Sequence, residues 1–344
     1  MRISTDRILT THVGSLPRSG EVVELLYKKD SGEPFDGLGL GAAVAAGVAD
    51  VVAKQVAAGV DVVSDGETSK VGYSTYIKDR LSGFAGHHSR PPHLDLAPYP
   101  ELREALGRML GKQSFKRAAC VAPIELVDST GVQTDLDNLR AALTVHGAEV
   151  TEAFVNAASP GVISAFQSNR YYASHDGEAE FLARAEYQVE ALNHAVRDIP
   201  ADRMRMHICW GNYEGPHDHD IPLEKILRLV LKAKPAGILF EAANPRHRHE
   251  CAVWGDAELP DDKVLIPGCI SSTSNYIEHP RLIAGQLCQY ADIVGRERVI
   301  AGTDCGFGSF AGYSRVDPAI AYKKLRALAE GAALATDRLW RNKH

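Results

Sequence analysis

Short apolar runs alternate with longer amphipathic patterns along this chain, and that alternation limits the fold more than any other feature of the sequence. Runs rich in Val, Ile and Leu predict buried strands, and apolar positions at helical spacing predict helices between them. The alternation is typical of a parallel sheet, because parallel strands need crossover connections. The predicted strands are Ile8–Val13, Val60–Ser64, Ala118–Ala122, Gly161–Phe166, Met204–Cys209, Gly237–Glu241, Val264–Cys269 and Val299–Gly302.

Helix signals lie between these strands. Leu40–Ala58 is rich in Ala and Val and ends at Gly59, a residue favoured after helix C-termini. Asp135–Ala158 begins with a capping residue and ends before a Ser-Pro-Gly breaker cluster. The remaining predicted helices are Glu178–Arg197, Leu223–Ala233, Tyr276–Val294 and Pro318–Ala335.

Eight predicted strands favour one closed (β/α)8 barrel, a TIM barrel, as a single domain over residues 1–344. The chain is longer than the roughly 250 residues typical of such barrels, so loop inserts are expected. The main predicted insert is residues 83–116, which are rich in His, Pro and Gly, and a smaller one is Pro216–Asp220.

Composition excludes several classes of function. A net charge of −6 gives no basic excess for nucleic acid, and 45% hydrophobic residues fit a globular protein. No apolar run reaches the roughly 18–20 residues of a membrane span, and the first residues lack the apolar core of a signal peptide. The six cysteines are irregularly spaced, so we expect a reducing, cytoplasmic location without a disulfide framework. Assembly into a homo-oligomer is left open.

Polar and metal-ligating residues gather where the predicted strands end. In barrel enzymes the active site lies at the C-terminal ends of the strands, so these residues are expected to meet. They are His12-Val13-Gly14-Ser15, Asp65-Gly66-Glu67, Gln167-Ser168-Asn169-Arg170, His207-Ile208-Cys209, Glu241, Cys269 and Cys305.

His207 and Cys209 form the sharpest motif. Residues two apart on a strand share one face, so an imidazole and a thiol would project side by side. Zn²⁺ prefers this kind of ligand pair. Glu241 and Cys305 follow later strands and would complete the ligand set, with Cys269 as the competing fourth ligand.

These residues, in this order, resemble the catalytic barrel of cobalamin-independent methionine synthase. The resemblance spans nearly the whole chain but corresponds to only the C-terminal half of that longer enzyme. Residues 240–247 and 301–307 resemble its short single-barrel relatives, which include the epoxyalkane:coenzyme M transferases. The motifs that carry the resemblance are Gly14-Ser15-Leu16-Pro17-Arg18, Asp65-Gly66-Glu67, His207-x-Cys209, Glu241 and Asp304-Cys305-Gly306.

The resemblance implies that His207, Cys209, Glu241 and Cys305 hold Zn²⁺. Bound zinc favours the deprotonated form of a substrate thiol, and the thiolate then attacks an electrophilic carbon. We therefore expect a zinc-dependent methyl or alkyl transferase that acts on a small thiol and a methyl or alkyl donor.

The chain departs from the methionine synthase pattern around the substrate. Gln167 lies where that family has an Asp that helps to bind the amino group of homocysteine, and Thr273 lies where it has a proton-donating His. The folate-stacking Trp after the third strand is missing from residues 123–129. The identity of the thiol and of the donor therefore stays open.

Further residues are candidates for substrate contact or acid–base chemistry. Glu67 and Asp65 could bind a cationic or hydroxyl group or act as general acid or base, but each could equally be a carboxylate that caps a helix. His12, Gly14 and Ser15 are candidates for substrate contact, with Gly14 and Ser15 acting through the backbone. His12 could instead be a histidine at the barrel mouth whose hydrogen bonds are satisfied. Candidates for an anionic substrate group are Arg18, Arg170 and Arg246, and candidates for the pocket lining are Trp210 and Tyr213.

Three other functions remain open. In an epoxide-opening thiol transferase the ring oxygen needs a proton, with Tyr213, His12 or an ordered water as donor. A decarboxylase resembling uroporphyrinogen decarboxylase would lack zinc, and a non-catalytic zinc barrel would have closed coordination. The histidines of residues 217–220 and 247–249 suggest a second metal, but we expect them in solvated loops.

Overall fold

The computed structural model describes residues 1–86, 94–109, 118–171 and 180–341. At its centre is a sheet of five strands in the order β1-β9-β8-β7-β6, in which every neighbouring pair is parallel. This confirms the parallel α/β class predicted from the alternation of strands and helices. The strands are β1 (Leu9–Thr10), β6 (Arg205–Ile208), β7 (Gly237–Phe240), β8 (Val264–Ile270) and β9 (Ile300–Thr303).

The remaining strands form two separate pairs. β2 (Val62–Ser64) and β5 (Glu152–Phe154) are parallel, whereas β3 (Phe84–Ala85) and β4 (Ala119–Cys120) are antiparallel. The described strands do not close into one sheet, so the closed eight-stranded barrel is not seen.

Side-chain bonds connect the five-stranded sheet to the β2–β5 pair where backbone ladders are missing. On one side, the Asp61 carboxylate accepts a hydrogen bond from the Thr10 amide at 2.8 Å. On the other, Arg205 Nη2 lies 2.9 Å from Glu152 Oε2. The two sheets are therefore held edge to edge by polar side chains.

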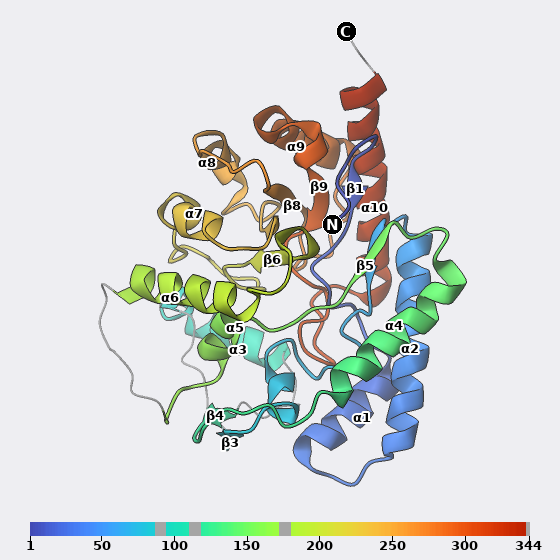
Figure 1. The fold of residues 1–344 in the computed structure, drawn as a ribbon, viewed down its shortest axis with the longest axis vertical. Helices are drawn as coiled ribbons and strands as arrows, with labels where there is room; N and C mark the ends of the chain where they lie inside the picture. Colours follow the sequence, from blue (N-terminus) through green and yellow to red (C-terminus); the bar gives the residue numbers. More distant parts are fainter. Residues whose placement is uncertain (87–93, 110–117, 172–179, 342–344) are drawn as a thin grey trace.

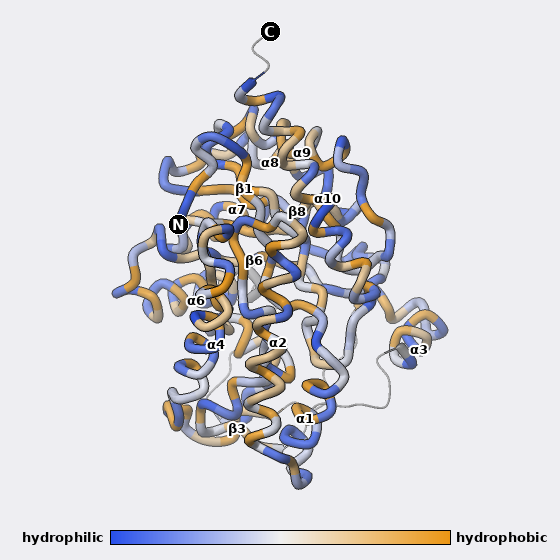
Figure 2. Tube along the Cα trace, turned by 90° about the vertical axis from the view of Figure 1, so that its right-hand side faces the viewer, coloured by the Kyte–Doolittle hydropathy of each residue, from blue (hydrophilic) through white to orange (hydrophobic). Residues whose placement is uncertain are grey.

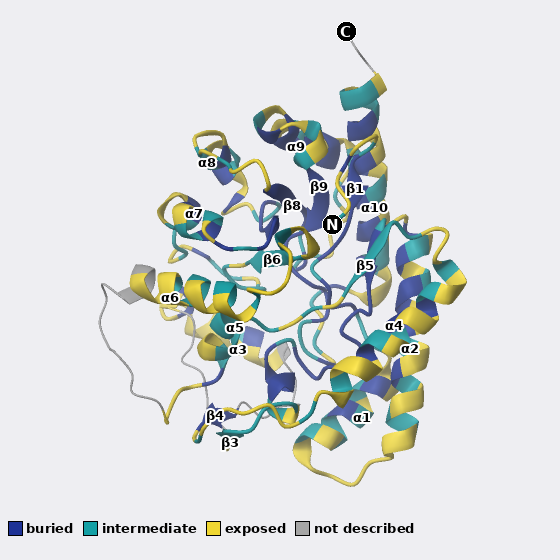
Figure 3. Ribbon diagram, in the orientation of Figure 1, coloured by how far each residue is buried: buried dark blue, intermediate teal, exposed yellow. Residues whose placement is uncertain are grey.

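Helices cover the outer faces of both sheets. Figure 1 shows α7 to α10 around the five-stranded sheet, with α2 and α4 beside β5. The faces that these helices turn inward are buried, and the opposite faces are exposed (Figure 3). The helices are α1 (Gly20–Ser31), α2 (Gly37–Ala57), α3 (Pro100–Met109), α4 (Thr130–His146), α5 (Pro160–Phe166), α6 (Glu180–Ala195), α7 (Leu223–Leu231), α8 (Cys251–Gly255), α9 (Pro280–Val294) and α10 (Pro318–Thr336).

Helix α2 is apolar enough to need separate comment. By length and composition alone it could cross a membrane, with a mean hydropathy of 1.5 over its apolar window. In the fold it contacts α1, α4 and β2 and buries a stripe that includes Val44, Val48 and Val52. Figure 2 shows its apolar colouring along the packed length. These contacts are those of a helix that packs one apolar face against the rest of the fold.

The predicted strand Gly161–Phe166 is wrong, because this segment belongs to α5. Ser159 Oγ accepts a hydrogen bond from the Val162 amide at 3.2 Å, and Pro160 occupies the first helical turn. A serine cap followed by proline is a strong helix start, and here it overrides the β-branched composition.

The predicted helix Asp135–Ala158 is also wrong at its C-terminal end. Helix α4 ends at His146, and β5 follows after a short turn. The amide of Thr151 donates to the Asp61 carbonyl at 2.8 Å, which brings β5 beside β2. A tertiary contact therefore decides the structure of this segment, and helical spacing did not reveal it.

The predicted insert at residues 83–116 lies partly outside the described residues. Its described part contains β3, a short 3₁₀ turn at Leu94–Leu96 and α3.

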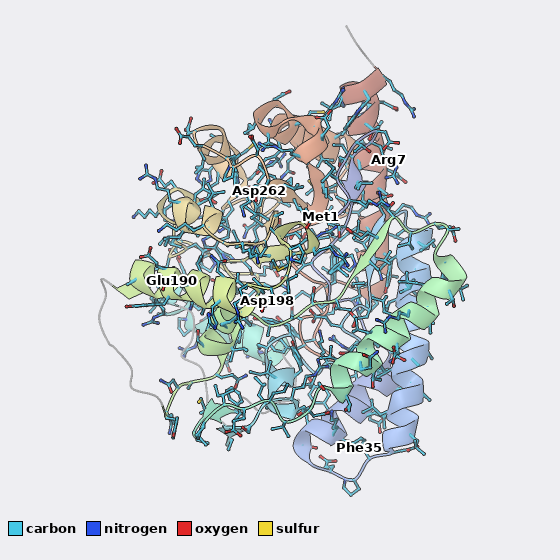
Figure 4. The ribbon with its side chains drawn as sticks, in the orientation of Figure 1. Met1, Arg7, Phe35, Glu190, Asp198 and Asp262 are labelled. Carbon is cyan, nitrogen blue, oxygen red and sulfur yellow. The ribbon has the colours of Figure 1, made fainter. Side chains whose placement is uncertain are left out.

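At the loop between α1 and α2, Phe35 projects away from both sheets (Figure 4). The largest buried side chains are instead near β7, where Phe240 packs against Trp254 with ring centroids 4.5 Å apart.

Candidate metal centre

The predicted ligands converge at the carboxyl ends of three strands. His207 lies in β6, Cys209 directly follows that strand, and Glu241 directly follows β7. Cys305 lies two residues beyond the end of β9. In the β6–β7 ladder His207 pairs with Leu239, so the parallel register brings the ends of both strands to one level.

The donor atoms are close enough for one metal ion. The donor atoms of His207, Cys209 and Cys305 all lie within 4.8 Å of one another. Cys305 Sγ is 3.5 Å from His207 Nε2 and 3.8 Å from Glu241 Oε1. Tetrahedral zinc with the usual bond lengths would separate such atoms by about 3.3–3.8 Å. The two sulfur atoms, at 3.2 Å, would need to move apart by about half an ångström.

Burial and the contacts between neighbouring side chains shift the pKa values of His207 and Cys305. Burial lowers the pKa of His207 to about 4, so its imidazole is neutral and free to act as a ligand. The hydrogen bond with Cys209, together with burial, raises the pKa of Cys305 well above its usual range. A divalent cation would reverse the effect on the thiols, because it stabilises the thiolate directly. Cys209 is the exposed member of the set, which leaves one side of the site accessible.

Backbone and amide groups hold the Glu241 carboxylate. Its Oε1 accepts from the Trp210 amide at 3.0 Å, and its Oε2 accepts from Asn244 Nδ2 at 3.1 Å. The loop itself is held by Asp304, whose Oδ1 accepts from the Ala242 and Ala243 amides. Burial raises the pKa of Asp304 to about 7. Partners of this kind orient a metal ligand without touching the metal.

Cys269 lies in the hydrophobic core, away from the ligand cluster. Its thiol donates to the Pro267 carbonyl at 3.5 Å, and burial raises its pKa. Of the two candidates for the fourth ligand, Glu241 is therefore the one beside Cys305.

Glu67 occupies a strained and buried position near the end of β2. Its backbone has a φ of 53°, which is unfavourable for any residue but glycine. Asn156 Nδ2 donates to Glu67 Oε1 at 2.5 Å, whereas Oε2 is buried and has no hydrogen-bond partner in the described part of the chain. Asp65 supports this turn by accepting from the Glu67 amide at 3.0 Å, and burial raises the pKa of Asp65. A strained backbone and a carboxylate oxygen without a partner are typical of a ligand site.

Position 14 has no room for a side chain, because the Asn156 side chain occupies that space. A Cβ on Gly14 would lie 1.9 Å from Asn156 Nδ2, and the glycine has a φ of +136°. The same Asn156 donates to the Val13 carbonyl at 2.8 Å. The close approach predicted at Gly14 therefore involves this asparagine. Ser15 contacts the loop after β9, because its carbonyl accepts from the Phe307 amide at 2.9 Å.

His12 and Arg18 bond to the protein itself. His12 Nε2 lies 2.7 Å from Gln55 Oε1, its Nδ1 accepts from the Gly14 amide, and burial lowers its pKa to about 4. Arg18 donates through Nε and Nη2 to the Glu67 carbonyl and through Nη1 to the Gly308 carbonyl. These bonds tie together the loops after β1, β2 and β9.

The two residues that depart from the methionine synthase pattern lie in separate places. Gln167 is buried at the end of α5, where its Nε2 donates to the Ser74 carbonyl at 3.2 Å and its Oε1 has no hydrogen-bond partner in the described chain. Thr273 lies in the loop after β8, with its hydroxyl 3.2 Å from Ser271 Oγ. Arg170 and Arg246 are exposed.

The histidines of the β6–α7 and β7–α8 loops are buried, so the prediction of solvated loops is wrong for His217 and His247. Asp220 Oδ2 lies 2.6 Å from His217 Nδ1 and 2.9 Å from His247 Nε2. Glu250 Oε2 lies 3.0 Å from His247 Nδ1. The donor atoms of His217, Asp220 and His247 lie close enough together to hold a metal. Zinc ligands of these types would lie about 3.3 Å apart, so the observed spacings describe hydrogen bonds between charged groups.

Trp210 and Tyr213 pack on this histidine network. The Trp210 ring stacks on His247 at a centroid distance of 4.0 Å, and its Nε1 donates to the Ile221 carbonyl. The Tyr213 hydroxyl donates to the buried carboxylate of Asp95, and burial raises its pKa. Both aromatic residues are therefore held by polar partners beside the ligand set.

The fold and the ligand cluster together define a parallel α/β protein with a candidate metal centre at its strand ends. No protein-family model and no curated protein sequence matches the chain. A B12-independent methionine synthase from Shewanella sp. W3-18-1, solved in complex with selenomethionine, matches with a TM-score of 0.72 and 18% identity, over 96% of this chain and 99% of that one. A candidate vitamin B12-independent methionine synthase from Listeria monocytogenes matches over the same shares with a TM-score of 0.52 and 18% identity. At this identity the likeness shows a shared fold.

Several residues of the site were not found from the sequence. Asn156 fell inside a predicted helix, and Asp304 was noticed only as part of the motif around Cys305. Nothing local in the sequence distinguishes Asn244 from other polar loop residues. Their positions depend on contacts between distant loops, which spacing along one chain does not reveal.

Proposed function

We propose that the protein is a zinc-dependent methyl or alkyl transferase whose acceptor is a small thiol. The observation that carries the proposal is the convergence of two thiols, an imidazole and a carboxylate at the ends of β6, β7 and β9, with donor spacings close to those of tetrahedral zinc. The likeness to solved structures described as B12-independent methionine synthases supports the same proposal.

We also infer that the two parallel sheets form a (β/α)8-like ring, since Asp61 and Glu152 bridge their edges.

His207, Cys209, Glu241 and Cys305 would hold the metal. Zinc bound there would lower the pKa of a coordinated substrate thiol, so that a thiolate is available near neutral pH. Hydrogen bonds from Trp210 and Asn244 orient Glu241, and the exposed side of Cys209 gives the thiol access. The thiolate sulfur attacks the methyl or alkyl carbon of the donor, a C–S bond forms, and the donor leaves with the electron pair of the broken bond.

Alkyl transfer is favoured over epoxide opening by the contacts of the two side chains that were candidates for the proton donor. Opening an epoxide leaves an alkoxide that must be protonated. The Tyr213 hydroxyl already donates to Asp95, and both ring nitrogens of His12 have partners in the protein. A donor that departs with the electron pair places no such demand on these residues.

The test is the metal content of protein purified without chelators. We expect about one zinc per chain, which Cys209→Ser and Cys305→Ser each reduce strongly. Cys288→Ser is the matched control, because Cys288 lies in α9 and outside the ligand cluster. Zinc-loaded protein should then alkylate a thiol in a panel of thiols and methyl donors. Protein without zinc, or zinc that survives both ligand substitutions, would contradict the proposal.

A further inference from the structure

A small polar cavity, with room for about one water-sized group such as a single ligand oxygen, is lined mainly by the loops that follow Cys209 and Cys305. It is lined by Asn212, Ser272, Phe307, Ser309, Tyr313 and Arg315. Asn212 follows Cys209 closely in the chain, and its Nδ2 donates to the carbonyl of Gly306, the residue after Cys305, at 2.9 Å. Asn212 therefore connects the loop after Cys209 to the loop after Cys305, and the cavity is lined by residues of both loops.

Arg315 supplies this cavity with positive charge. Its side chain is only 5% exposed, and its ionic partner Glu214 lies 3.4 Å away with a side chain that is 69% exposed. A solvated carboxylate at this distance offsets little of the guanidinium charge. Arg315 Nε donates to the Tyr313 hydroxyl at 2.8 Å. A guanidinium has five N–H donors, so several remain for a ligand.

Two hydroxyl groups add further donors. Ser309 Oγ accepts from Asn212 Nδ2 at 2.9 Å, and the Tyr313 oxygen accepts from Arg315. Neither hydroxyl donates to any residue in the described ranges, so both hydrogens can reach a ligand. Ser272, by contrast, donates to Asn212 Oδ1. The cavity lining contains no carboxylate.

We propose that Arg315, Tyr313 and Ser309 form a subsite for the oxyanion of a short thiol, either a carboxylate or a sulfonate. The proposal rests on the proposed function, in which a thiol binds at the metal. Guanidinium and hydroxyl donors match the oxygens of such groups, and their charge-assisted hydrogen bonds are stronger than neutral ones. A thiol with an ammonium group would instead be repelled by Arg315. The substrate class is therefore a small thiol with an anionic group.

Binding of four thiols to zinc-loaded protein tests this subsite. The probes are 3-mercaptopropionate, 2-mercaptoethanesulfonate, neutral 2-mercaptoethanol and cationic 2-aminoethanethiol, measured by titration calorimetry. We expect the anionic thiols to bind roughly tenfold or more tighter than the neutral one, as a charged hydrogen bond would give. The tighter of the two anions identifies the oxyanion.

Variants separate this subsite from the metal centre. Arg315→Gln should abolish the preference for anionic thiols and leave zinc content and 2-mercaptoethanol affinity unchanged, while Arg315→Lys should retain part of the preference. Arg140→Gln, at a 65% exposed position on α4, is the control. Equal affinities for neutral and anionic thiols would overturn the subsite and leave the proposed function standing. If no thiol bound the zinc-loaded protein, the proposed function would fail first.

Discussion

Asp304 Oδ1 accepts a hydrogen bond from the Ala242 amide at 2.8 Å, and so joins the loop of one candidate ligand to the loop of another. Ala242 follows Glu241, and Asp304 precedes Cys305. One buried carboxylate thus fixes the relative position of two ligands that are 64 residues apart.

We expect Asp304→Ala to weaken zinc binding by roughly 10–100-fold, the usual effect of removing a partner that orients metal ligands. Competition with a chelating dye would measure the change. Asp36→Ala is the control, since Asp36 accepts from the Leu38 amide at the start of α2, far from the ligands in sequence. Unchanged zinc affinity in Asp304→Ala would show that the loops hold their positions without this bond.

Gly14→Ala should destabilise the protein by about 1–3 kcal/mol. The new Cβ would overlap the Asn156 amide, 1.9 Å away, in a backbone conformation with a φ of +136°. Gly41→Ala is the matched control, because nothing lies within 4 Å of its added Cβ. Within α2 that change should stabilise by up to about 1 kcal/mol. Urea unfolding of both variants gives the comparison, and equal signs would contradict the assigned role of Asn156.

The His247 network predicts a loss of stability at alkaline pH. Burial alone would lower the pKa of His247, but hydrogen bonds to Asp220 and Glu250 raise it from 6.5 to about 9. A folded-state pKa above the unfolded value means that the contribution is complete below pH 6.5 and disappears as the pH rises through 9. Wild type should therefore lose part of its unfolding free energy between these values.

His247→Gln should show a smaller loss across the same range, because Gln does not titrate. His217, whose pKa is also raised, would keep part of the effect. Urea unfolding at intervals from pH 6 to 10 measures the difference between wild type and variant. A difference that did not shrink at high pH would mean that His247 is neutral in the folded protein.

Glu67→Gly is expected to separate stability from function. Relief of the left-handed backbone at φ 53° offsets the entropy cost of glycine, and removal of the buried Oε2 that lacks a partner offsets the lost bond from Asn156. The unfolding free energy should therefore change by less than about 1 kcal/mol. Thiol alkylation should fall, because the buried Oε2 has no described partner and is available to a substrate. Thermal unfolding and activity are compared on the same preparations. Full activity in this variant would assign Glu67 a purely structural role.

The sequence predicted the parallel α/β class, and the proximity of the four candidate ligands, better than the connections between elements. We expected His207, Cys209, Glu241 and Cys305 to meet because each lies at or just after the end of an apolar strand, and parallel strands meet at their carboxyl ends. The strand predicted at Gly161–Phe166 was wrong, because Ser159 and Pro160 before it start a helix. His247 is buried because it forms hydrogen bonds with Asp220 and Glu250. The contact with Asp220 joins two different loops, and a polar loop sequence gives no sign of it.

The molecule has two parallel sheets that are joined at their edges by the side chains of Asp61 and Glu152. The four candidate ligands belong to the five-stranded sheet, whereas Glu67 and Asn156 belong to the loops of the β2–β5 pair. Side-chain bridges yield more easily than a continuous backbone ladder, because each depends on one or two bonds that water can replace. Arg18 adds a further connection at the candidate site, because it donates to the Glu67 carbonyl and to the Gly308 carbonyl in the loop of Cys305. Glu67 is therefore held near the candidate ligands even where the sheet edges lack a backbone ladder.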